Sequence, residues 1–397
     1  MVLQESAAGV DVQNRPRLRM KRYRTHIALM LLVASFPWAL GFAAGGSEGL
    51  GFTTYYFSDS GDNSVITTSF NLAKRLLANT LLLFDIELDQ VTVPPVTAVT
   101  GATRPQRRKN EPFKKNRGQV IVGIQQGVLE NATLALTYYR SQEVDYRSNA
   151  AVLTYSQELN DKNTTITLRG QYNADLVGKI LENGDLVNQR KKTSTGSLNV
   201  SQVLSPNTVL DFSYDFVVHK GFLSDPYRQV RVYDALGAST LVDEVHPDYR
   251  VRHAGALRMS QFIVPIKASF IASYRYYFDT WKVRSHTAEV KFNKYIFNDL
   301  IFGVDYRYYT QTQASFYADR YVQPNLATDY RTSDYKLKPF SSNNFGFSLT
   351  YLLRGLAKGN ADLEFLRDSA IELMYFRYFN DMDFSANIIQ ATVKFSI

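Results

Sequence analysis

The stretch from Lys267 to Gln311 alternates between apolar and polar residues with a period of two. One side of its last segment carries Phe302, Val304, Tyr306 and Tyr308, and the other carries Gly303, Asp305, Arg307, Tyr309 and Gln311. Successive side chains of a β-strand point to opposite faces of the sheet, so this spacing predicts strands. The alternation extends over about ten residues or more, whereas strands of globular proteins most often have about five or six. A soluble β-sandwich and a membrane barrel both fit this pattern, because each has one apolar and one polar face.

An export signal precedes the alternating region. Lys21, Arg22 and Arg24 stand before the apolar run 27–42, which is followed by small residues. A basic segment, an apolar segment and a small-residue cleavage zone are typical of a secretory signal peptide. Because Met20 directly precedes the basic cluster, we expect translation to start there, with residues 1–19 arising from a miscalled start. The leader then spans 1–44, with the signal peptide at 20–44, and the barrel spans 45–397. A membrane-anchoring helix is the disfavoured alternative, because the run is short and contains a proline.

After the leader, alternation and turn residues predict about sixteen strands. Their expected ranges are 50–58, 63–75, 79–92, 118–128, 132–143, 147–159, 164–176, 191–204, 207–219, 249–262, 266–279, 282–297, 300–312, 341–354, 362–378 and 385–397. Short turns alternate with mostly longer polar links, at 93–117, 177–190, 220–248 and 313–340. Short turns on one rim and long loops on the other are typical of outer-membrane barrels. We therefore predict an all-β fold, a transmembrane antiparallel up-and-down β-barrel of about 16 strands with both termini periplasmic.

Composition agrees with a barrel and argues against other classes. The chain has 397 residues, 13% of them aromatic, and no cysteine, which excludes small cross-linked folds and thiolate metal sites. The formal net charge of +8 includes six basic and two acidic residues of the leader, so the remainder carries 8 − (6 − 2) = +4. A weakly basic protein does not argue for nucleic acid as a partner.

The last strand carries a further signal. Ile389, Ala391, Val393, Phe395 and Ile397 share one face, with polar residues between them. An alternating C-terminal strand with a terminal aromatic is typical of substrates of the barrel-insertion machinery, although here the aromatic stands two residues before the end. An ordinary amphipathic edge strand is the alternative.

Four sequence blocks resemble one family. They are GFLSDPYRQVRVYD (221–234), HPDYRVRHAGALRM (246–259), SYRYYFDTWKVRSHTAEVKF (273–292) and DYRYYTQTQASFYADR (305–320), and the TGATRP stretch (100–105) also fits. The chain resembles the Gram-negative outer-membrane barrels grouped as the domain of unknown function DUF3570. That resemblance implies the fold and the location but no mechanism. Members are said to be encoded near a flavin-transferring enzyme and thioredoxin-like proteins, which would imply a role beside a cell-envelope redox system.

Charged residues on the polar face of the strands form the first candidate site. Outward-facing charges would cost a few kcal/mol each near the middle of a membrane, so we expect these side chains to line the lumen. They are Asp85, Glu87, Asp89, Arg250, Arg252, Arg258, Arg275, Glu289, Lys291, Asp305 and Arg307. Two hypotheses stay open: a polar pore whose acidic and basic walls select solutes, and a packed network that only rigidifies the barrel.

A basic loop is the second candidate site. The segment 104–117 carries seven basic residues: Arg104, Arg107, Arg108, Lys109, Lys114, Lys115 and Arg117. The loop would either constrict the mouth for anions or contact lipopolysaccharide phosphates from outside. The third alternative is a solvated surface loop.

Catalytic and metal sites are poorly supported. His219 and His246 fall near a loop with Asp225, Asp243, Glu244 and Asp248, but no spacing matches a known hydrolase or metal motif. We expect no enzymatic activity, no metal and no cofactor.

The sequence thus predicts a porin-like outer-membrane barrel that passes small hydrophilic solutes through a charged lumen. Its expected partners are outer-membrane lipid, lipopolysaccharide and the insertion machinery, and an envelope protein is a further candidate. The alternative is a closed barrel that acts as a binding or scaffold protein through its long external loops, beside the envelope redox system that the resemblance suggests.

Overall fold

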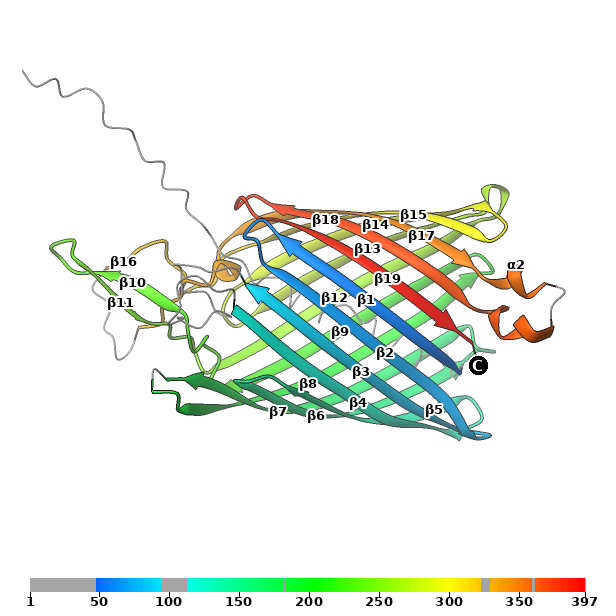
Figure 1. Cartoon of the computed structure of the whole chain (residues 1–397), viewed down its shortest axis with the longest axis horizontal. Coiled ribbons are helices and arrows are strands. Elements are labelled where there is room, and N and C mark those ends of the chain that lie inside the picture. The colour runs from blue at the N-terminus through cyan, green and yellow to red at the C-terminus, as the bar shows by residue number, and fades with distance from the viewer. Residues whose placement is uncertain (1–47, 94–112, 182, 323–328, 359–360, 397) are drawn as a thin grey trace, which may run out of the picture.

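A computed structural model describes residues 48–93, 113–181, 183–322, 329–358 and 361–396. Sixteen antiparallel strands close into a barrel, and a separate three-stranded sheet stands at one end (Figure 1). The barrel strands are β1 (Gly49–Asp59), β2 (Ser64–Leu77), β3 (Thr80–Val93), β4 (Phe113–Leu129), β5 (Ala132–Gln142), β6 (Tyr146–Leu159), β7 (Thr164–Ile180), β8 (Leu186–Ser205), β9 (Thr208–Gly221), β12 (Tyr249–Ile263), β13 (Ala268–Asp279), β14 (Arg284–Phe297), β15 (Leu300–Gln311), β17 (Phe340–Leu352), β18 (Ala370–Asn380) and β19 (Ser385–Phe395). The small sheet has the order β11 (Ser239–Asp243), β10 (Gln229–Tyr233) and β16 (Tyr321–Val322).

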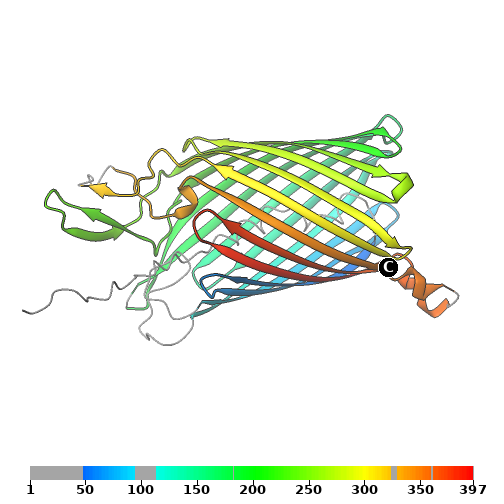
Figure 2. The same ribbon diagram turned by 90° about the horizontal axis from the view of Figure 1, so that it is seen from above.

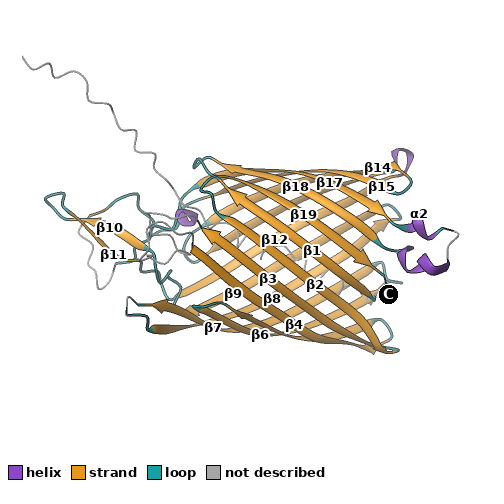
Figure 3. Ribbon diagram, viewed as in Figure 1, coloured by secondary structure: helices purple, strands orange, loops and turns teal. Residues whose placement is uncertain are grey.

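Helical turns are confined to the two ends of the molecule (Figure 3). They are η2 (Val264–Ile266), η3 (Tyr335–Leu337), α2 (Arg354–Ala357) and η4 (Ala361–Leu366). Within the described part of the chain, none of the helices has the length and apolar character needed to cross a membrane.

The barrel is closed by its first and last strands. β1 pairs with β19 over ten residue pairs, from Leu50 with Phe395 to Asp59 with Ala386. The beginning of β1 and the end of β19 therefore lie on one rim, which we call the terminal rim, and the opposite end is the loop rim (Figures 1 and 2). The predicted all-β barrel of about sixteen strands is confirmed.

The outward face of the barrel wall is apolar and the inward face is polar, which is the reverse of a water-soluble protein. On β3 the inward-facing Asp85 and Asp89 are 9% and 4% exposed, whereas the outward-facing Ile86 and Leu88 are 37% and 56% exposed. The same alternation runs through the other strands, because the register shifts only in four strand pairs, each time beside a turn at the terminal rim. An apolar exterior over a polar interior is the arrangement expected when hydrocarbon surrounds the barrel.

Apolar contacts inside the barrel are concentrated near its two rims. Phe57, Tyr378, Phe384 and Ala386 form a buried cluster beside the loop rim. Ala73, Leu81 and Leu83 form another near the terminal rim. Between these clusters the inner wall includes buried charged and hydroxyl side chains such as Asp85, Ser69 and Thr392.

Four expectations about segments are wrong. The long link expected at 177–190 is a short turn, because β7 continues to Ile180 and β8 begins at Leu186. β4 begins at Phe113, so residues 113–117 belong to a strand and not to the long loop. β18 begins at Ala370, because the alternating residues of the segment 362–366 form η4 and find no neighbouring strand. The two links expected to be simple loops, 220–248 and 313–340, contain the small sheet, in which β10 pairs with β11 and β16.

Candidate functional site

The acidic side of the inner wall lies on β3. Asp85, Glu87 and Asp89 share its inward face, and Thr67 on β2 donates a hydrogen bond to Asp89 at 2.6 Å. Arg117 on β4 lies between the last two carboxylates, with its Nη2 2.5 Å from Glu87 and its Nε 2.6 Å from Asp89. One guanidinium therefore neutralises part of a wall that carries three carboxylates.

The predicted basic loop is divided by the structure. Lys115 points inward, with its Nζ in an ion pair with Glu143 and 2.6 Å from Asp145. Lys114 points outward and is exposed. Lys114, Lys115 and Arg117 therefore lie in β4, and their assignment to a loop is wrong. The other four basic residues, Arg104, Arg107, Arg108 and Lys109, lie outside the described residues.

The basic side of the inner wall begins on β12. Arg250, Arg252 and Arg258 alternate with outward-facing residues such as Leu257, which is 50% exposed. Arg275 on the neighbouring β13 also faces inward, opposite Ala256 of β12. The register thus gathers four guanidinium groups on two adjacent strands.

These arginines differ in how they are neutralised. Arg250 donates from Nε to Asp279 at 2.9 Å, and Tyr277 donates to the same carboxylate at 2.5 Å. The Arg250 guanidinium also lies 4.1 Å from the ring centroid of Trp281. Arg252 makes no ion pair with the described residues, and its Nε has no hydrogen-bond partner among them.

The remaining predicted residues extend this wall onto β14 and β15. Glu289 lies directly opposite Arg307, and Lys291 lies directly opposite Asp305. These cross-strand neighbours have opposite charges, an arrangement that stabilises a strand pair. All eleven predicted residues of the first candidate site thus have their side chains on the inward face.

The acidic and basic sides lie across the barrel from each other. In the order of the closed sheet, seven strands separate β3 from β13 in either direction. Glu87 and Arg275 are each seven positions from the terminal-rim end of their strands, since 87 − 80 and 275 − 268 are both seven. The two sides therefore face each other at about the same depth.

Several inward-facing charges are absent from the predicted set. Asp175 on β7 accepts from Ser148 at 2.6 Å and lies 3.4 Å from Lys191 on β8. Asp215 on β9 accepts from Ser197 at 2.7 Å. The signal for Asp215 was present in DFSYDF, where acids alternate with aromatics. The pairing of Asp175 with Lys191 depends on a register that the sequence does not show.

Above the loop rim, a buried ionic cluster joins the two longest connections. Arg228 lies 3.4 Å from Glu244 and 3.1 Å from Asp334, and Thr332 donates to Glu244 at 2.8 Å. Burial would raise the pKa of Glu244, but the contact with His246 and the charge of Arg228 outweigh it and lower that pKa to about 2. Burial raises the pKa of Asp225, which lies beside Arg228.

An aromatic cluster anchors this assembly to the barrel. Trp281, in the turn between β13 and β14, packs with Val283, Ala314 and Leu337. The rings of Trp281 and Phe316 stand edge to face at a centroid distance of 5.1 Å. We call the Arg228 cluster and this aromatic cluster together the loop cap.

The histidines considered for catalysis stand in different surroundings. His219 faces inward on β9, with its Nδ1 3.0 Å from the Thr193 hydroxyl. His246 belongs to the loop cap, with its Nε2 3.2 Å from Glu244. Among the described residues no cluster of three or more histidine or acidic side chains has metal-binding geometry.

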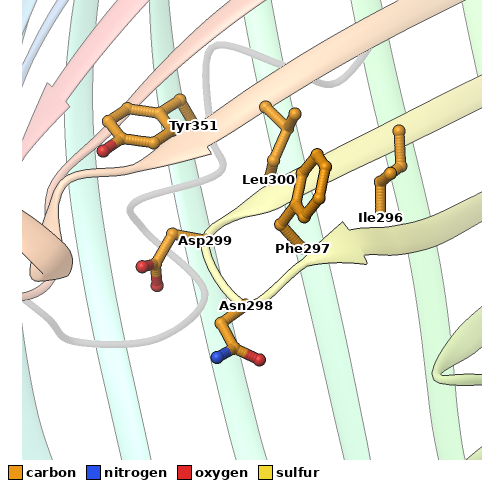
Figure 4. Close-up of a pocket in the computed structure, with 6 residues that line it drawn as sticks. All are labelled: Ile296, Phe297, Asn298, Asp299, Leu300 and Tyr351. Atoms are coloured by element: carbon orange, nitrogen blue, oxygen red, sulfur yellow. The ribbon is translucent and has the colours of Figure 1, made fainter.

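A shallow depression lies at the turn between β14 and β15, with a volume of about 610 Å³ (Figure 4). Its Asp299 is paired with Arg354 at 2.6 Å, and its other lining residues include Phe297, Leu300 and Tyr351. The depression lies at the terminal rim and contains none of the predicted residues, so the charged inner wall remains the candidate site.

Several solved structures match most of this chain at low sequence identity. OccAB1 of Acinetobacter baumannii is 9% identical, covering 88% of this chain and 96% of that one with a TM-score of 0.46. A BenF-like porin from Pseudomonas fluorescens Pf-5 is 9% identical, covering 88% and 98% with a TM-score of 0.44. A bacterial polysaccharide outer membrane secretin is 11% identical, covering 89% and 99% with a TM-score of 0.48.

No curated protein matches the sequence. A family model described as "Protein of unknown function (DUF3570)" matches residues 95–187 and 179–397, which is more than half of the chain. The chain therefore belongs to the DUF3570 family.

Proposed function

We propose that this chain is an outer-membrane channel that passes small hydrophilic solutes through a lumen with opposed acidic and basic walls. The observation that carries the proposal is the position of Glu87 on β3 across the barrel from Arg275 on β13. Glu87 is flanked by two further carboxylates, and Arg275 has three arginines on the adjacent strand β12. Placing these charges inside the barrel costs free energy unless water or a polar solute solvates them.

The membrane location is supported by the polarity of the wall. Leu257 and Tyr274, on neighbouring strands, are exposed outward in the middle of the barrel, where a soluble protein would bury them. The predicted signal peptide and the insertion-type C-terminal strand support export to the outer membrane. On this proposal the terminal rim faces the periplasm and the loop rim faces outward.

Opposed fixed charges act on solutes in a defined way. A field directed from the β12–β13 wall to the β3 wall orients water and dipolar solutes across the lumen. Carboxylate or phosphate groups are attracted to the guanidinium side, where Arg252 has no partner among the described residues. Amines are attracted to the carboxylates of β3. The arrangement suits small solutes that carry charge or a strong dipole.

Single-channel recording tests this proposal. Purified protein without its leader, refolded in detergent, is added to a planar bilayer of neutral lipid in salt solution. The proposal requires stepwise openings of reproducible size. Folding is established when boiled and unboiled samples migrate differently on a denaturing gel. A bilayer that stays silent with protein folded by this criterion would rule out a channel.

The loop cap favours a second candidate, a scaffold that displays its outer loops to an envelope protein. The β10–β11 hairpin extends beyond the barrel (Figures 1 and 2), and Leu236 at its tip is 95% exposed. A silent bilayer, together with a protein partner whose binding depends on Leu236, would support the scaffold and not the channel.

A further inference from the structure

The outward face of the barrel wall has charges of one sign only. In the sixteen described barrel strands, every outward position that carries a charge is basic, and no outward position carries a carboxylate. Eight of these basic residues lie in the half of their strands nearest the loop rim, and two, Lys74 and Lys294, lie near the terminal rim. The eight are Lys114, Arg140, Arg147, Arg190, Lys192, Lys220, Arg284 and Arg377.

The densest part of this distribution lies on β8 and β9. Lys192 is directly opposite Lys220, and Arg190 follows two positions away on the same face. All three side chains are exposed, and none makes an ion pair with the described residues. Like charges directly opposite one another destabilise a strand pair, so this arrangement favours a bound anion.

The inward neighbour of these residues provides an internal comparison. Lys191 faces the lumen, and its Nζ lies 3.4 Å from the carboxylate of Asp175. The same short segment therefore neutralises its inward lysine and leaves its outward cations without a carboxylate. Whatever neutralises the outward group must come from outside the described chain.

An apolar groove lies on the same outward face, closer to the middle of the barrel. Gly170 on β7 is directly opposite Gly196 on β8, and a Cβ atom built at either would have no neighbour within 4 Å. The groove has a volume of about 460 Å³. Its walls include the side chains of Leu153, Leu168, Leu198 and Phe216.

The spacing between the two features matches a lipid. Gly196 follows Lys192 by four residues on the same face of β8, which corresponds to about 13 Å along the strand. A phosphate held by the cations would therefore place an acyl chain of the same molecule at the groove. Three cations on two adjacent strands also favour a headgroup with several anionic oxygens over one with a single charge.

We propose that β7, β8 and β9 form a site for one molecule of lipopolysaccharide, with its lipid A phosphates on Arg190, Lys192 and Lys220 and one acyl chain in the groove at Gly170 and Gly196. The site rests on the outer-membrane location given in the proposed function, since lipopolysaccharide would surround the loop rim there. It does not depend on conduction through the lumen.

Native mass spectrometry of the refolded protein in detergent tests the site, with purified bisphosphorylated lipid A as the probe. We expect one lipid A to be retained by the wild-type protein. The combined change Arg190→Gln, Lys192→Gln and Lys220→Gln should weaken retention about tenfold or more, because it removes every charge of the cluster. The matched control, Lys74→Gln with Lys294→Gln, removes outward lysines near the other rim and should leave retention unchanged.

Two further arms separate the contributions of charge and groove. Dephosphorylated lipid A should bind the wild-type protein as weakly as bisphosphorylated lipid A binds the triple variant. Gly196→Leu should reduce retention of lipid A while leaving the three cations in place, because the new side chain would occupy the groove and its Cβ would meet no atom within 4 Å. Heat-dependent migration of each variant establishes that it has folded.

Equal retention of lipid A by the wild-type protein and the triple variant would overturn the site, as would equal retention of the phosphorylated and dephosphorylated forms. Phosphatidylglycerol bound as tightly as lipid A would also overturn it in favour of a general anionic-lipid surface. A protein that binds lipid A but gives a silent bilayer would contradict the channel and not this site.

Discussion

Nε of Arg117 on β4 lies 2.6 Å from the carboxylate of Asp89, its directly opposite neighbour on β3. This ion pair lies on the inner wall, where the side chain of Asp89 is only 4% exposed and that of Arg117 is 22% exposed. Since Arg117 also contacts Glu87, its charge is the main compensation for two of the three carboxylates on β3.

Replacing Arg117 by glutamine should destabilise the barrel. The change leaves two carboxylates of the inner wall without a cation, and unsatisfied buried groups cost about 1–3 kcal/mol. Urea unfolding, followed by the migration of unboiled protein, measures the loss. Lys114→Gln on the same strand is the matched control, because Lys114 points outward and is exposed. Equal midpoints for the two variants would show that the ion pair contributes nothing.

Ion selectivity should shift in opposite directions when the two walls are neutralised separately. Arg275→Gln weakens the attraction for anions and should move the reversal potential in a potassium chloride gradient towards that of a cation-selective pore. Glu87→Gln should move it the other way. Bilayer recordings of the two variants and of the wild-type protein give the sign directly.

Arg284→Gln is the control for these recordings. Arg284 lies on β14, the strand next to Arg275 of β13, but its side chain is on the outward face and exposed. Its removal should leave the reversal potential unchanged. If Arg284→Gln and Arg275→Gln shift selectivity equally, the inner wall does not control ion passage.

The loop cap should loosen in acid. The pKa of Glu244 is lowered from 4.5 to about 2 in the folded protein, so its carboxylate stabilises the cap fully above pH 4.5. That contribution is lost as the pH falls from about 4.5 to about 2. Only two tryptophans occur in the sequence, and Trp38 lies in the predicted leader, so fluorescence of Trp281 reports on the cap in protein expressed without residues 1–44.

Glu244→Gln isolates this effect. The variant should show Trp281 fluorescence that is already altered at neutral pH and that changes less between pH 4.5 and 2. Asp225 has the opposite effect on the pH dependence of cap stability. Because its pKa is raised in the folded protein, its protonation in acid favours the folded state. An acid transition that is the same in the variant and the wild-type protein would mean that Glu244 does not control the cap.

The strands could be predicted because their information is local. An inward and an outward residue alternate in every segment such as 300–312, and β15 (Leu300–Gln311) matches that range closely. The inward position of Arg275 and Arg307 follows from the same alternation, since each lies between aromatic neighbours. Periodicity therefore gave the strands and the face of these charges, and the export signal and the loop pattern favoured a barrel over a sandwich.

The pairing of charges could not be predicted, because it depends on contacts between strands. Arg117 stands in a basic segment that resembles a solvated loop, and its partners Glu87 and Asp89 lie 30 and 28 residues earlier. Only the register of β3 with β4 brings them together. The loop cap could not be predicted for the same reason, since its paired residues Arg228 and Asp334 are more than a hundred residues apart.

The outward-facing cations were missed for a related reason. Lys192 and Lys220 fall at or beyond the ends of the predicted strands, where alternation is weakest as a signal. Their direct opposition appears only when β8 and β9 are paired.

Cysteine accessibility across β12 is the most direct test of a charged lumen through which solutes pass. Because the sequence has no cysteine, an introduced cysteine supplies the only thiol that can react. Ala256 faces inward on this strand and the adjacent Leu257 faces outward. In a bilayer, Ala256→Cys should react with a charged, water-soluble thiol reagent and change the single-channel current, whereas Leu257→Cys should not react. Equal reaction at both positions, or modification of Ala256→Cys without any change in current, would contradict a charged lumen through which solutes pass.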